Sequence, residues 1–433
     1  MLERGRLLLR HKNMHSTPSE PQATSTRLFY ASSLLIATNL VAGVLGYIFQ
    51  ITMAQLLQST EFSLFSAFNS LYFILGSPFA ALVMLLARRT ASLQANHQTH
   101  KIFELYIFWQ KCILYYFIFF AFFIFLTTPS LKQWLRCSNT LHLWLFYLGL
   151  FFSCLVLTNI GIIQGLQRYT WLGILSIIVV LSKLVFCCSL ISTMRLGVQG
   201  ALIGTLISTA LTWLIGFYLL LQTLSSNEKK FIKTAVTFTW SESLPVILAN
   251  VGFILFTQMD VPIVNYFFES RISGSFSAAA VLGKAILFLP AGIATALFPM
   301  IAAEKDSEHS SNPLLWQSIL FTTVLTLATA TTYYFYATQI CTFLFGTKYP
   351  LAGSYLQLYG FMMIPFTLLF VFKNYFIAKG SSLFPCLLGL ASCLALLLMV
   401  IWPKQPFDII AILFLLGWLL VVSCVFIERL KVS

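Results

Sequence analysis

Residues 102–128 read IFELYIFWQKCILYYFIFFAFFIFLTT, and this stretch decides the fold. It carries only two charged residues, Glu104 and Lys111, and is otherwise almost entirely aromatic or aliphatic. The hydrocarbon core of a bilayer is about 30 Å thick, and an α-helix of about 20 apolar residues crosses it. The stretch therefore predicts a helix that spans a membrane.

The same pattern recurs along the whole chain. Of the 433 residues, 59% are hydrophobic and 9% are charged, whereas soluble domains carry about 25% charged residues, so a soluble fold is excluded. The predicted fold is an all-α polytopic membrane protein with twelve transmembrane helices. Their expected ranges are Leu28 to Gln50, Phe62 to Ala87, Ile102 to Thr128, Leu141 to Ile163, Thr170 to Met194, Val198 to Gln222, Ser243 to Phe267, Phe276 to Ala302, Leu314 to Tyr336, Leu351 to Phe372, Leu383 to Trp402 and Phe407 to Ile427.

The formal net charge is +13, and the basic residues sit on a very apolar chain rather than in one polar tract. This distribution argues against nucleic-acid binding and favours loops that face anionic lipid. With both termini placed in the cytoplasm, most Lys and Arg residues outside the spans fall on the cytoplasmic side. The positive-inside rule therefore predicts an even number of spans with both termini cytoplasmic.

Four segments are expected along the chain. Residues 1–27 are basic and then rich in Ser, Thr, Pro and Gln, which is typical of a disordered cytoplasmic tail. Residues 28–222 and residues 243–433 each hold six predicted spans, and residues 223–242 form a basic cytoplasmic linker between them. The two halves show weak internal similarity. In transporters such repeats bind the substrate at their interface, so we expect a central site.

The sequence lacks the motifs of several enzyme classes. It has no Gly-x-x-x-x-Gly-Lys-Ser/Thr loop for nucleotide phosphates, no His-Glu-x-x-His motif and no Ser/His/Asp set in one aqueous segment. The nine cysteines lie mostly in apolar runs without the spacing of a zinc site, and we interpret them as buried apolar residues. We expect neither an enzyme nor a bound metal or cofactor. A proton gradient, a sodium gradient and the membrane potential all stay open as energy sources.

Five ionisable side chains are predicted inside the spans, where charge is costly unless it meets water, a partner or a substrate. Lys183 lies near the middle of its span, and Lys111 lies toward the cytoplasmic side of its own. Lys373 is near enough to the cytoplasmic end for its ammonium to snorkel. Asp260 and Lys284 fall at similar depth on consecutive spans, which predicts an ion pair. That pair is either a structural bridge or a coupling and gating site.

Lysines outnumber acids at this depth, and Lys183 has no acid in its own span or the flanking ones. An unpaired cation there needs a water-filled cavity, and a cationic cavity favours a phosphate or pyrophosphate group. Asn39 and Asn250 fall in the middle of the first span of each half, where amides either tie helices together or bind substrate. The candidate cavity residues are Lys183, Lys284, Lys111, Asn39 and Asn250, with Asp260 as the coupling residue.

Several segments together resemble the multidrug/oligosaccharidyl-lipid/polysaccharide (MOP) flippase superfamily, particularly its Wzx-like oligosaccharide exporter branch. GIIQGLQRY (161–169) is similar to the turn after the fourth span, and GVQGALIGTLIS (197–208) to the start of the sixth. In the second half, SGSFSAAAVLGKAILFLP (273–290) and LFPMIA (297–302) follow the order of the family, as does LFGTKYPLAG (344–353) before the tenth span.

This resemblance implies a MATE-like fold of two six-helix bundles around a cleft. It implies a bacterial inner-membrane protein that moves an undecaprenyl-pyrophosphate-type oligosaccharide from the cytoplasmic to the outer leaflet, for polysaccharide or O-antigen biosynthesis. Its partners would be lipid-linked saccharide, membrane lipid and, as a further candidate, glycan polymerase machinery. Lipid II flippases typically place arginines in the first two helices; the first span has none, which argues against peptidoglycan. A cation-coupled multidrug or metabolite exporter and a membrane glycan polymerase or ligase stay open as alternatives.

Overall fold

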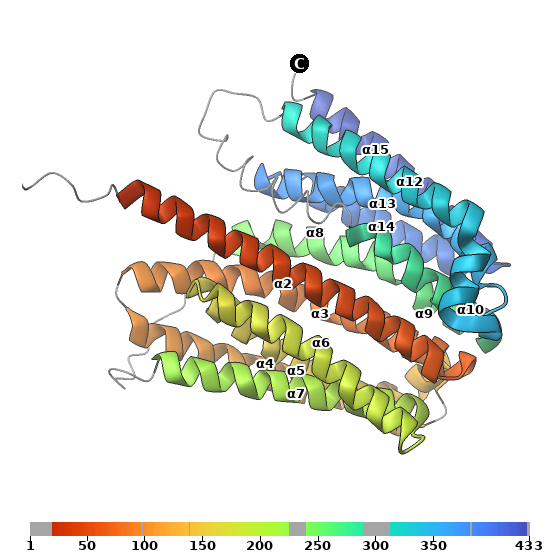
Figure 1. Ribbon diagram of the computed structural model, residues 1–433, viewed down its shortest axis with the longest axis horizontal. Helices are drawn as coiled ribbons and strands as arrows, with labels where there is room; N and C mark the ends of the chain where they lie inside the picture. Colours follow the sequence, from red (N-terminus) through yellow and green to blue (C-terminus); the bar gives the residue numbers. More distant parts are fainter. Residues whose placement is uncertain are drawn as a thin grey trace, which may run out of the picture.

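A computed structural model describes residues 20–96, 98–137, 139–224, 240–288, 312–381 and 383–430. Over these ranges the chain forms helices joined by short turns, with no strand (Figure 1). The elements are α2 (Glu20–Leu56), α3 (Ser59–Ala95), α4 (Thr99–Leu135), α5 (Thr140–Gly165), α6 (Tyr169–Ser192), α7 (Gly197–Leu224), α8 (Trp240–Gln258), α9 (Asp260–Phe267), α10 (Ser270–Lys284), η1 (Ala285–Leu287), α12 (Asn312–Phe345), η2 (Gly346–Lys348), α13 (Ala352–Ala378), α14 (Leu383–Ile401) and α15 (Pro406–Leu430).

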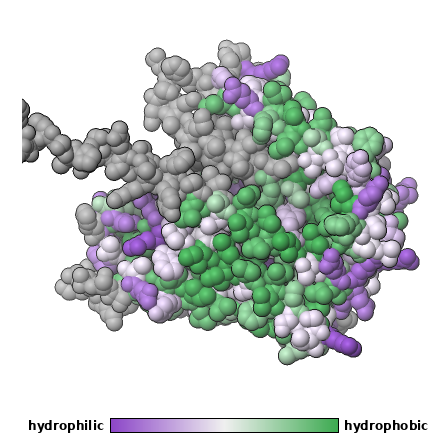
Figure 2. All heavy atoms as spheres, viewed as in Figure 1, coloured by the Kyte–Doolittle hydropathy of each residue, from purple (hydrophilic) through white to green (hydrophobic). Residues whose placement is uncertain are grey.

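The chain is an all-α, multi-pass membrane protein. Eleven helical segments of the described residues are long and apolar enough to cross a membrane, with α8 and α9 together forming one of them. The eighth predicted span begins in α10, and the part of it after Phe288 lies outside the described residues. Figure 2 shows a broad hydrophobic area over the visible face, as expected for a surface that contacts lipid.

All three of the expected segment boundaries fall on residues that are helical. α2 begins at Glu20, so the structure continues a helix into residues 20–27 of the expected disordered tail. Pro21 is compatible with this start, because the first turn of a helix needs no backbone N–H from its proline. α7 runs to Leu224 and α8 begins at Trp240, at the two edges of the expected linker. Residues 1–19 and 225–239 lie outside the described residues.

The helices pack into two groups that follow the order of the chain (Figure 1). In the N-terminal half, α5 and α6 both pack against α7, α3 packs against α5, and α2 packs against α6. In the C-terminal half, α12 and α15 pack against α13, and α14 packs against α8. The main connection between the halves is α3, which contacts α8, α9 and α10.

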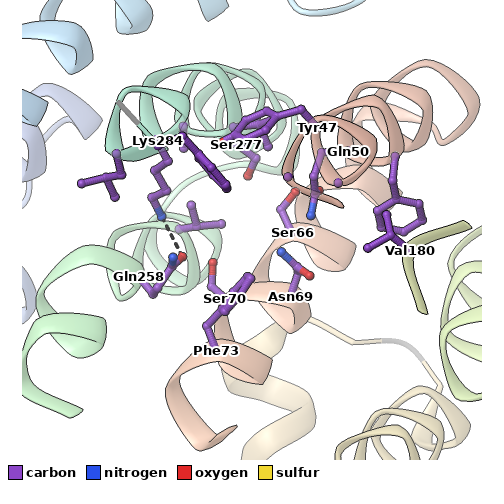
Figure 3. A pocket seen from close by; sticks show the side chains of 18 of the residues that line it. Tyr47, Gln50, Ser66, Asn69, Ser70, Phe73, Val180, Gln258, Ser277 and Lys284 are labelled. Atoms are coloured by element: carbon purple, nitrogen blue, oxygen red, sulfur yellow. Dashed lines mark hydrogen bonds between the residues drawn. The ribbon is translucent and has the colours of Figure 1, made fainter. Parts of the chain in front are cut away.

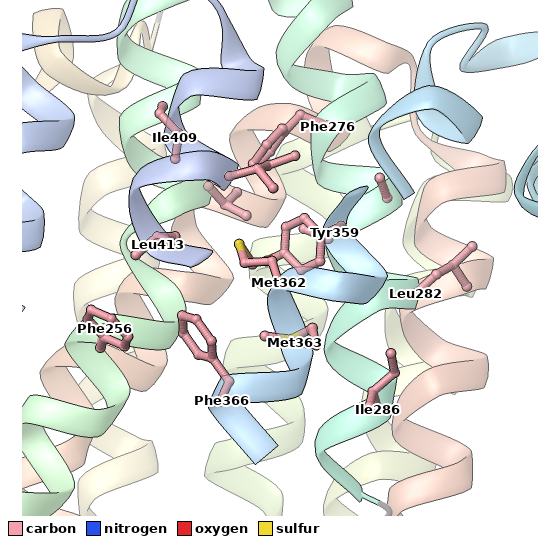
Figure 4. Packing of buried hydrophobic residues seen from close by; sticks show 14 of the residues in the cluster. Phe256, Phe276, Leu282, Ile286, Tyr359, Met362, Met363, Phe366, Ile409 and Leu413 are labelled. Atoms are coloured by element: carbon pink, nitrogen blue, oxygen red, sulfur yellow. The ribbon is translucent and has the colours of Figure 1, made fainter. Parts of the chain in front are cut away.

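The largest hydrophobic core surrounds α13 of the C-terminal half and extends to α2 and α3 (Figure 4). Phe366 of α13 stacks on Phe256 of α8 with ring centroids 4.8 Å apart. Tyr359 of α13 is fully buried and packs edge-on against Phe276 of α10, with centroids 5.9 Å apart. Because these rings are large and well packed, they fix the positions of α8 and α10 relative to α13.

The two halves are joined at the end that carries the α2–α3 turn, which we call the α2–α3 end. The hydroxyl of Ser63 lies 2.7 Å from the Asn265 amide oxygen and 2.6 Å from the Ser273 hydroxyl, and all three residues are buried. The side-chain amide of Gln55 donates to the carbonyl of Leu344 at 2.7 Å. Hydrogen bonds between α3 and α9, α3 and α10, and α2 and α12 thus hold this end closed.

The seventh span is broken within the hydrophobic region. α8 ends at Gln258 and α9 starts at Asp260, with Met259 between them in a bend. Pro262 explains the break, because it has no N–H to bond the carbonyl of Gln258 four residues earlier. The break lies next to the cavity described below, and the side chains of Gln258 and Asp260 on either side of it both bond Lys284.

Candidate functional site

A cavity of about 410 Å³ lies between the two halves, lined by residues of α2, α3, α6, α8, α9 and α10 (Figure 3). Polar lining comes from both halves, including Asn69 of α3 and Gln258 of α8. Aromatic rings form much of the remaining lining, among them Tyr47 and Phe73. A cavity of this volume has room for several water molecules, so ionised side chains at its surface can be hydrated.

Lys183 of α6 reaches this cavity. Its ammonium lies 5.1 Å from the centroid of the Phe49 ring, which gives it a cation–π contact. No described carboxylate forms an ion pair with Lys183. A cation whose described partner is an aromatic face is stable inside a membrane protein when water or an anionic ligand completes its surroundings.

Lys284, the last residue of α10, lines the same cavity. Its Nζ atom donates to Oδ1 of Asp260 at 2.9 Å and to Oε1 of Gln258 at 3.1 Å. The ion pair between Asp260 and Lys284, predicted from their similar depth on consecutive spans, is therefore present. Its role in coupling or gating stays a prediction. A cation at the C-terminal end of a helix is also favoured by the helix dipole.

Asp260 is almost completely buried and both of its oxygens have partners. Its side chain is 1% exposed; Oδ1 accepts from Lys284 and Oδ2 accepts from the hydroxyl of Tyr359. Gly283 makes the tyrosine contact feasible, because a Cβ atom at position 283 would lie 2.2 Å from Cδ1 of Tyr359. Asp260 of α9 thus binds Lys284 of α10 and Tyr359 of α13, and these contacts connect the three helices.

Further polar side chains line the cavity that were not among the predicted site residues. Figure 3 shows Gln50, Ser66, Ser70 and Ser277 around the same space as Lys284. Each is a polar residue within an otherwise apolar span, which is the signal that marks it in the sequence. Serine alone is a weak signal, because its hydroxyl can also bond the backbone of its own helix.

Lys111 is not among the residues that line the cavity. It is exposed on α4, and Phe108 and Tyr115, about one turn away on either side, are exposed too. The position of Lys111 within its predicted span gave its depth along the helix axis. The direction of its side chain depends on the rotation of α4 about that axis, which the sequence does not give. The structure does not bring Lys111 to the other two lysines, so we leave it out of the proposed site.

The two predicted asparagines lie away from the cavity. Asn39 is exposed on α2, one turn before the cavity-lining residues Ala42 and Gly43. The side chain of Asn250 donates to the carbonyl of Val246 and accepts from Lys373 Nζ at 3.1 Å. Asn250 therefore connects α8 to α13. Of the two roles expected for it, connecting helices or binding substrate, the structure shows the first.

Lys373 does not snorkel. It is 8% exposed, and its ammonium lies 4.9 Å from the ring centroid of Phe253 and 4.8 Å from that of Phe370. Together with the amide oxygen of Asn250, the two rings provide a local environment for the charge inside the protein. The ammonium is therefore buried among other helices, and the prediction that it snorkels out of the protein is wrong.

Within the described ranges, no three His, Cys, Asp or Glu side chains gather as a metal-binding group. The chemistry available at the cavity is therefore that of two ammonium groups, neutral amides, hydroxyls and aromatic rings. Such a surface can bind and orient an anionic, hydroxyl-bearing molecule.

Comparison with known proteins agrees with this architecture. Residues 28–305 match the family described as polysaccharide biosynthesis protein. The lipid II flippase MurJ in an inward closed conformation has a similar structure, with a TM-score of 0.69, 15% identity, and coverage of 92% of this chain and 87% of that one. No curated protein matches the chain.

Multidrug transporters of the MATE family also share the fold. An inward-facing MATE transporter of the MOP superfamily has a TM-score of 0.67 at 14% identity, covering 90% of this chain and 94% of that one. A point mutant of the Vibrio cholerae MATE transporter VcmN has a TM-score of 0.60 at 14% identity, covering 92% of this chain and 98% of that one. At these identities the similarity concerns the fold and not the substrate.

The resemblance found in the sequence segments is thus confirmed by two independent findings. The family match includes more than half of the chain, and the fold is that of flippases and transporters. The chain belongs to the family described as polysaccharide biosynthesis protein.

Proposed function

We propose that this protein flips a lipid-linked oligosaccharide, of the undecaprenyl-pyrophosphate type, from the cytoplasmic to the outer leaflet for polysaccharide or O-antigen biosynthesis. The observation that carries the proposal is the convergence of Lys183 and Lys284 on one cavity between the two halves. Lys183 comes from the N-terminal half and Lys284 from the C-terminal half, so one anionic headgroup can contact both.

The pyrophosphate would bind by charge-assisted hydrogen bonds to the two ammonium groups. Lys183 is available without breaking an ion pair to a described residue. Lys284 is held by Asp260, so a phosphate oxygen would compete with the carboxylate for its protons. This competition gives Asp260 its proposed role: it neutralises Lys284 in the empty cavity and releases it when the headgroup arrives.

The surfaces around the cavity suggest where the glycan and the lipid tail of the substrate would lie. The glycan would pass through the hydrated space between the halves. The lipid tail would stay in the bilayer, because the outer faces of the helices expose many large apolar side chains that suit lipid. The positive-inside distribution of Lys and Arg supports an inner-membrane location with both termini cytoplasmic.

The decisive experiment measures polymer export in a deletion strain that carries plasmid-borne variants. We expect Lys183→Gln and Lys284→Gln each to lower export about tenfold, the effect of losing one hydrogen bond to a charged group. Lys111→Gln is the matched control, since Lys111 is exposed on α4 away from the cavity. Protein abundance is followed for each variant, and wild-type export by both cavity variants at normal abundance would refute the proposal.

The location of accumulated intermediates separates the remaining classes of function. A deletion strain of a flippase should accumulate lipid-linked saccharide on the cytoplasmic leaflet. Finished repeat units on the outer leaflet would instead indicate a polymerase or ligase. Increased sensitivity to cationic dyes with unchanged surface polysaccharide would indicate a multidrug exporter.

A further inference from the structure

Gln258 shares the ammonium group of Lys284 with Asp260. Nζ of Lys284 donates to Oε1 of Gln258 at 3.1 Å and to Oδ1 of Asp260 at 2.9 Å, and Figure 3 shows the bond to Gln258. Because an ammonium group only donates hydrogen bonds, the oxygen of the Gln258 amide must face it. A lysine ammonium has three N–H donors, so one of them remains for a ligand after these two bonds.

The two acceptors differ in their relation to the cavity. Gln258 and Lys284 both line the cavity, whereas Asp260 does not, and the side chain of Asp260 is 1% exposed. The side chain of Lys284 is 12% exposed. The amide of Gln258 therefore holds the ammonium at the surface of the cavity, while the carboxylate of Asp260 binds it from inside the protein.

The break in the seventh span allows both residues to reach one atom. On a continuous α-helix, side chains two positions apart do not face each other, because each residue turns the helix by about 100°. α8 ends at Gln258 and α9 starts at Asp260, so the two side chains belong to different helices. They can therefore converge on the same ammonium group, although they are only two residues apart in the sequence.

The two acceptors also differ in charge. The carboxylate of Asp260 neutralises the ammonium, whereas the amide of Gln258 accepts a hydrogen bond and leaves the positive charge in place. A lysine side chain has many rotamers, and ordering a free one costs entropy when a ligand binds. Gln258 thus orders the side chain of Lys284 without reducing its attraction for an anion.

We propose that Gln258 is a positioning residue, which holds the ammonium group of Lys284 at the surface of the cavity so that an anionic headgroup can bind it. This inference rests on the proposed function. When a phosphate oxygen displaces Asp260, the bond to Gln258 keeps the ammonium in place. Without Gln258, Asp260 would be the one acceptor of Lys284 among the described residues, and the ammonium would turn toward the carboxylate and away from the cavity.

The test measures the affinity of the full-length protein in detergent for farnesyl pyrophosphate, by isothermal titration calorimetry. Gln258→Met removes the amide from a side chain of similar length, and we expect it to weaken binding about fivefold, the effect of one typical hydrogen bond. Gln258→Glu keeps the shape but adds a second carboxylate beside Lys284, so it should weaken binding more. Gln222→Met is the matched control, because Gln222 is exposed on α7 and bonds the Tyr218 hydroxyl.

A double-mutant cycle separates positioning of Lys284 from a merely structural role. If Gln258 acts through Lys284, Gln258→Met should have no further effect on affinity in the Lys284→Gln protein. It should keep its full effect in the Lys183→Gln protein, because no hydrogen bond joins Gln258 to Lys183 in the described structure. A merely structural role would lower the melting temperature and would weaken binding equally in both proteins.

The lysine variants make the two proposals separable. If Lys183→Gln and Lys284→Gln leave the affinity unchanged, the proposed function fails and the inference fails with it. If both variants weaken binding but Gln258→Met does not, only the inference about Gln258 fails. The inference is also overturned if Gln258→Met weakens binding equally with and without Lys284, or if Gln258→Glu binds as tightly as the wild type.

Discussion

The Nζ atom of Lys348 lies 3.0 Å from the carbonyl oxygen of Gln55, at the C-terminal end of α2. The same ammonium donates to the carbonyl of Ala54 at 3.2 Å and to that of Leu57. The last carbonyls of a helix lack donors within the helix and carry the negative end of its dipole. A lysine of the C-terminal half thus completes the end of a helix in the N-terminal half, and this contact joins the halves at the α2–α3 end.

We expect Lys348→Met to let the α2–α3 end open more often, by about tenfold in the opening equilibrium, because several hydrogen bonds to one ammonium are lost. Opening exposes backbone amides, so hydrogen exchange followed by mass spectrometry should be faster in residues 54–66 and 344–352. Lys404→Met is the matched control, since Lys404 is an exposed lysine in the α14–α15 turn. Unchanged exchange in both ranges would show that Lys348 does not hold this end closed.

The Asp260–Lys284 pair is expected to behave differently in stability and in transport. Asp260→Asn leaves Lys284 without its counter-ion, and breaking a buried pair costs about 3 kcal/mol. The double variant Asp260→Asn/Lys284→Met removes both charges and should recover much of the thermal stability. If the pair were only a structural bridge, transport would recover with it.

We expect the double variant to stay inactive in polymer export, because the headgroup would then lack one of its two cations. The readouts are the melting temperature of the purified protein and export in the deletion strain. A double variant that recovers both stability and export would assign the pair a purely structural role.

Gly283 provides a test of how closely Tyr359 must approach Asp260. Alanine at position 283 would place its Cβ within 2.2 Å of the tyrosine ring, so α10 and α13 must move apart. Overpacking of this kind costs about 1–3 kcal/mol. We expect Gly283→Ala to lower the melting temperature, whereas Gly389→Ala, in open space on α14, should leave it unchanged. Equal melting temperatures for both variants would contradict the tight contact.

Much of the fold was predictable because transmembrane helices leave a strong hydropathy signal. The charged part of the cavity was predictable for a related reason: ionised groups are rare in spans, so Lys183, Asp260 and Lys284 stand out. Sequence position gives the depth of such a residue but not the direction of its side chain. Lys111 therefore carried the same signal as Lys183, although it is exposed on α4 and Lys183 lines the cavity.

The serines that line the cavity could not be predicted for a different physical reason. Serine is small and satisfies itself within a helix, so Ser66 and Ser277 look in the sequence like Ser182, which bonds its own helix. Only the packing of α3 against α10 shows that these two residues line the same cavity. The prediction that Lys373 snorkels was wrong for the same reason. Its partners Phe253 and Asn250 belong to α8, and only the packing of α8 against α13 shows that they surround its ammonium.

The environment of Lys373 leads to the last prediction. Its buried ammonium has one amide oxygen, that of Asn250, and two aromatic rings as its described partners. Asn250→Leu removes the oxygen and leaves the charge with the rings alone, so we expect a loss of about 2–3 kcal/mol, typical of an unpaired buried charged group. Lys373→Met removes the charge itself and should be nearly neutral, because an apolar side chain of similar length fills the same space.

The combination of the two changes tests this explanation directly. Asn250→Leu/Lys373→Met should melt close to the wild-type temperature, because the apolar pair leaves no group unsatisfied. Since neither residue lines the cavity, the double variant should also keep export. If Lys373→Met alone abolished export while the melting temperature stayed normal, Lys373 would carry a charge that transport requires, and its role could no longer be limited to joining α8 and α13.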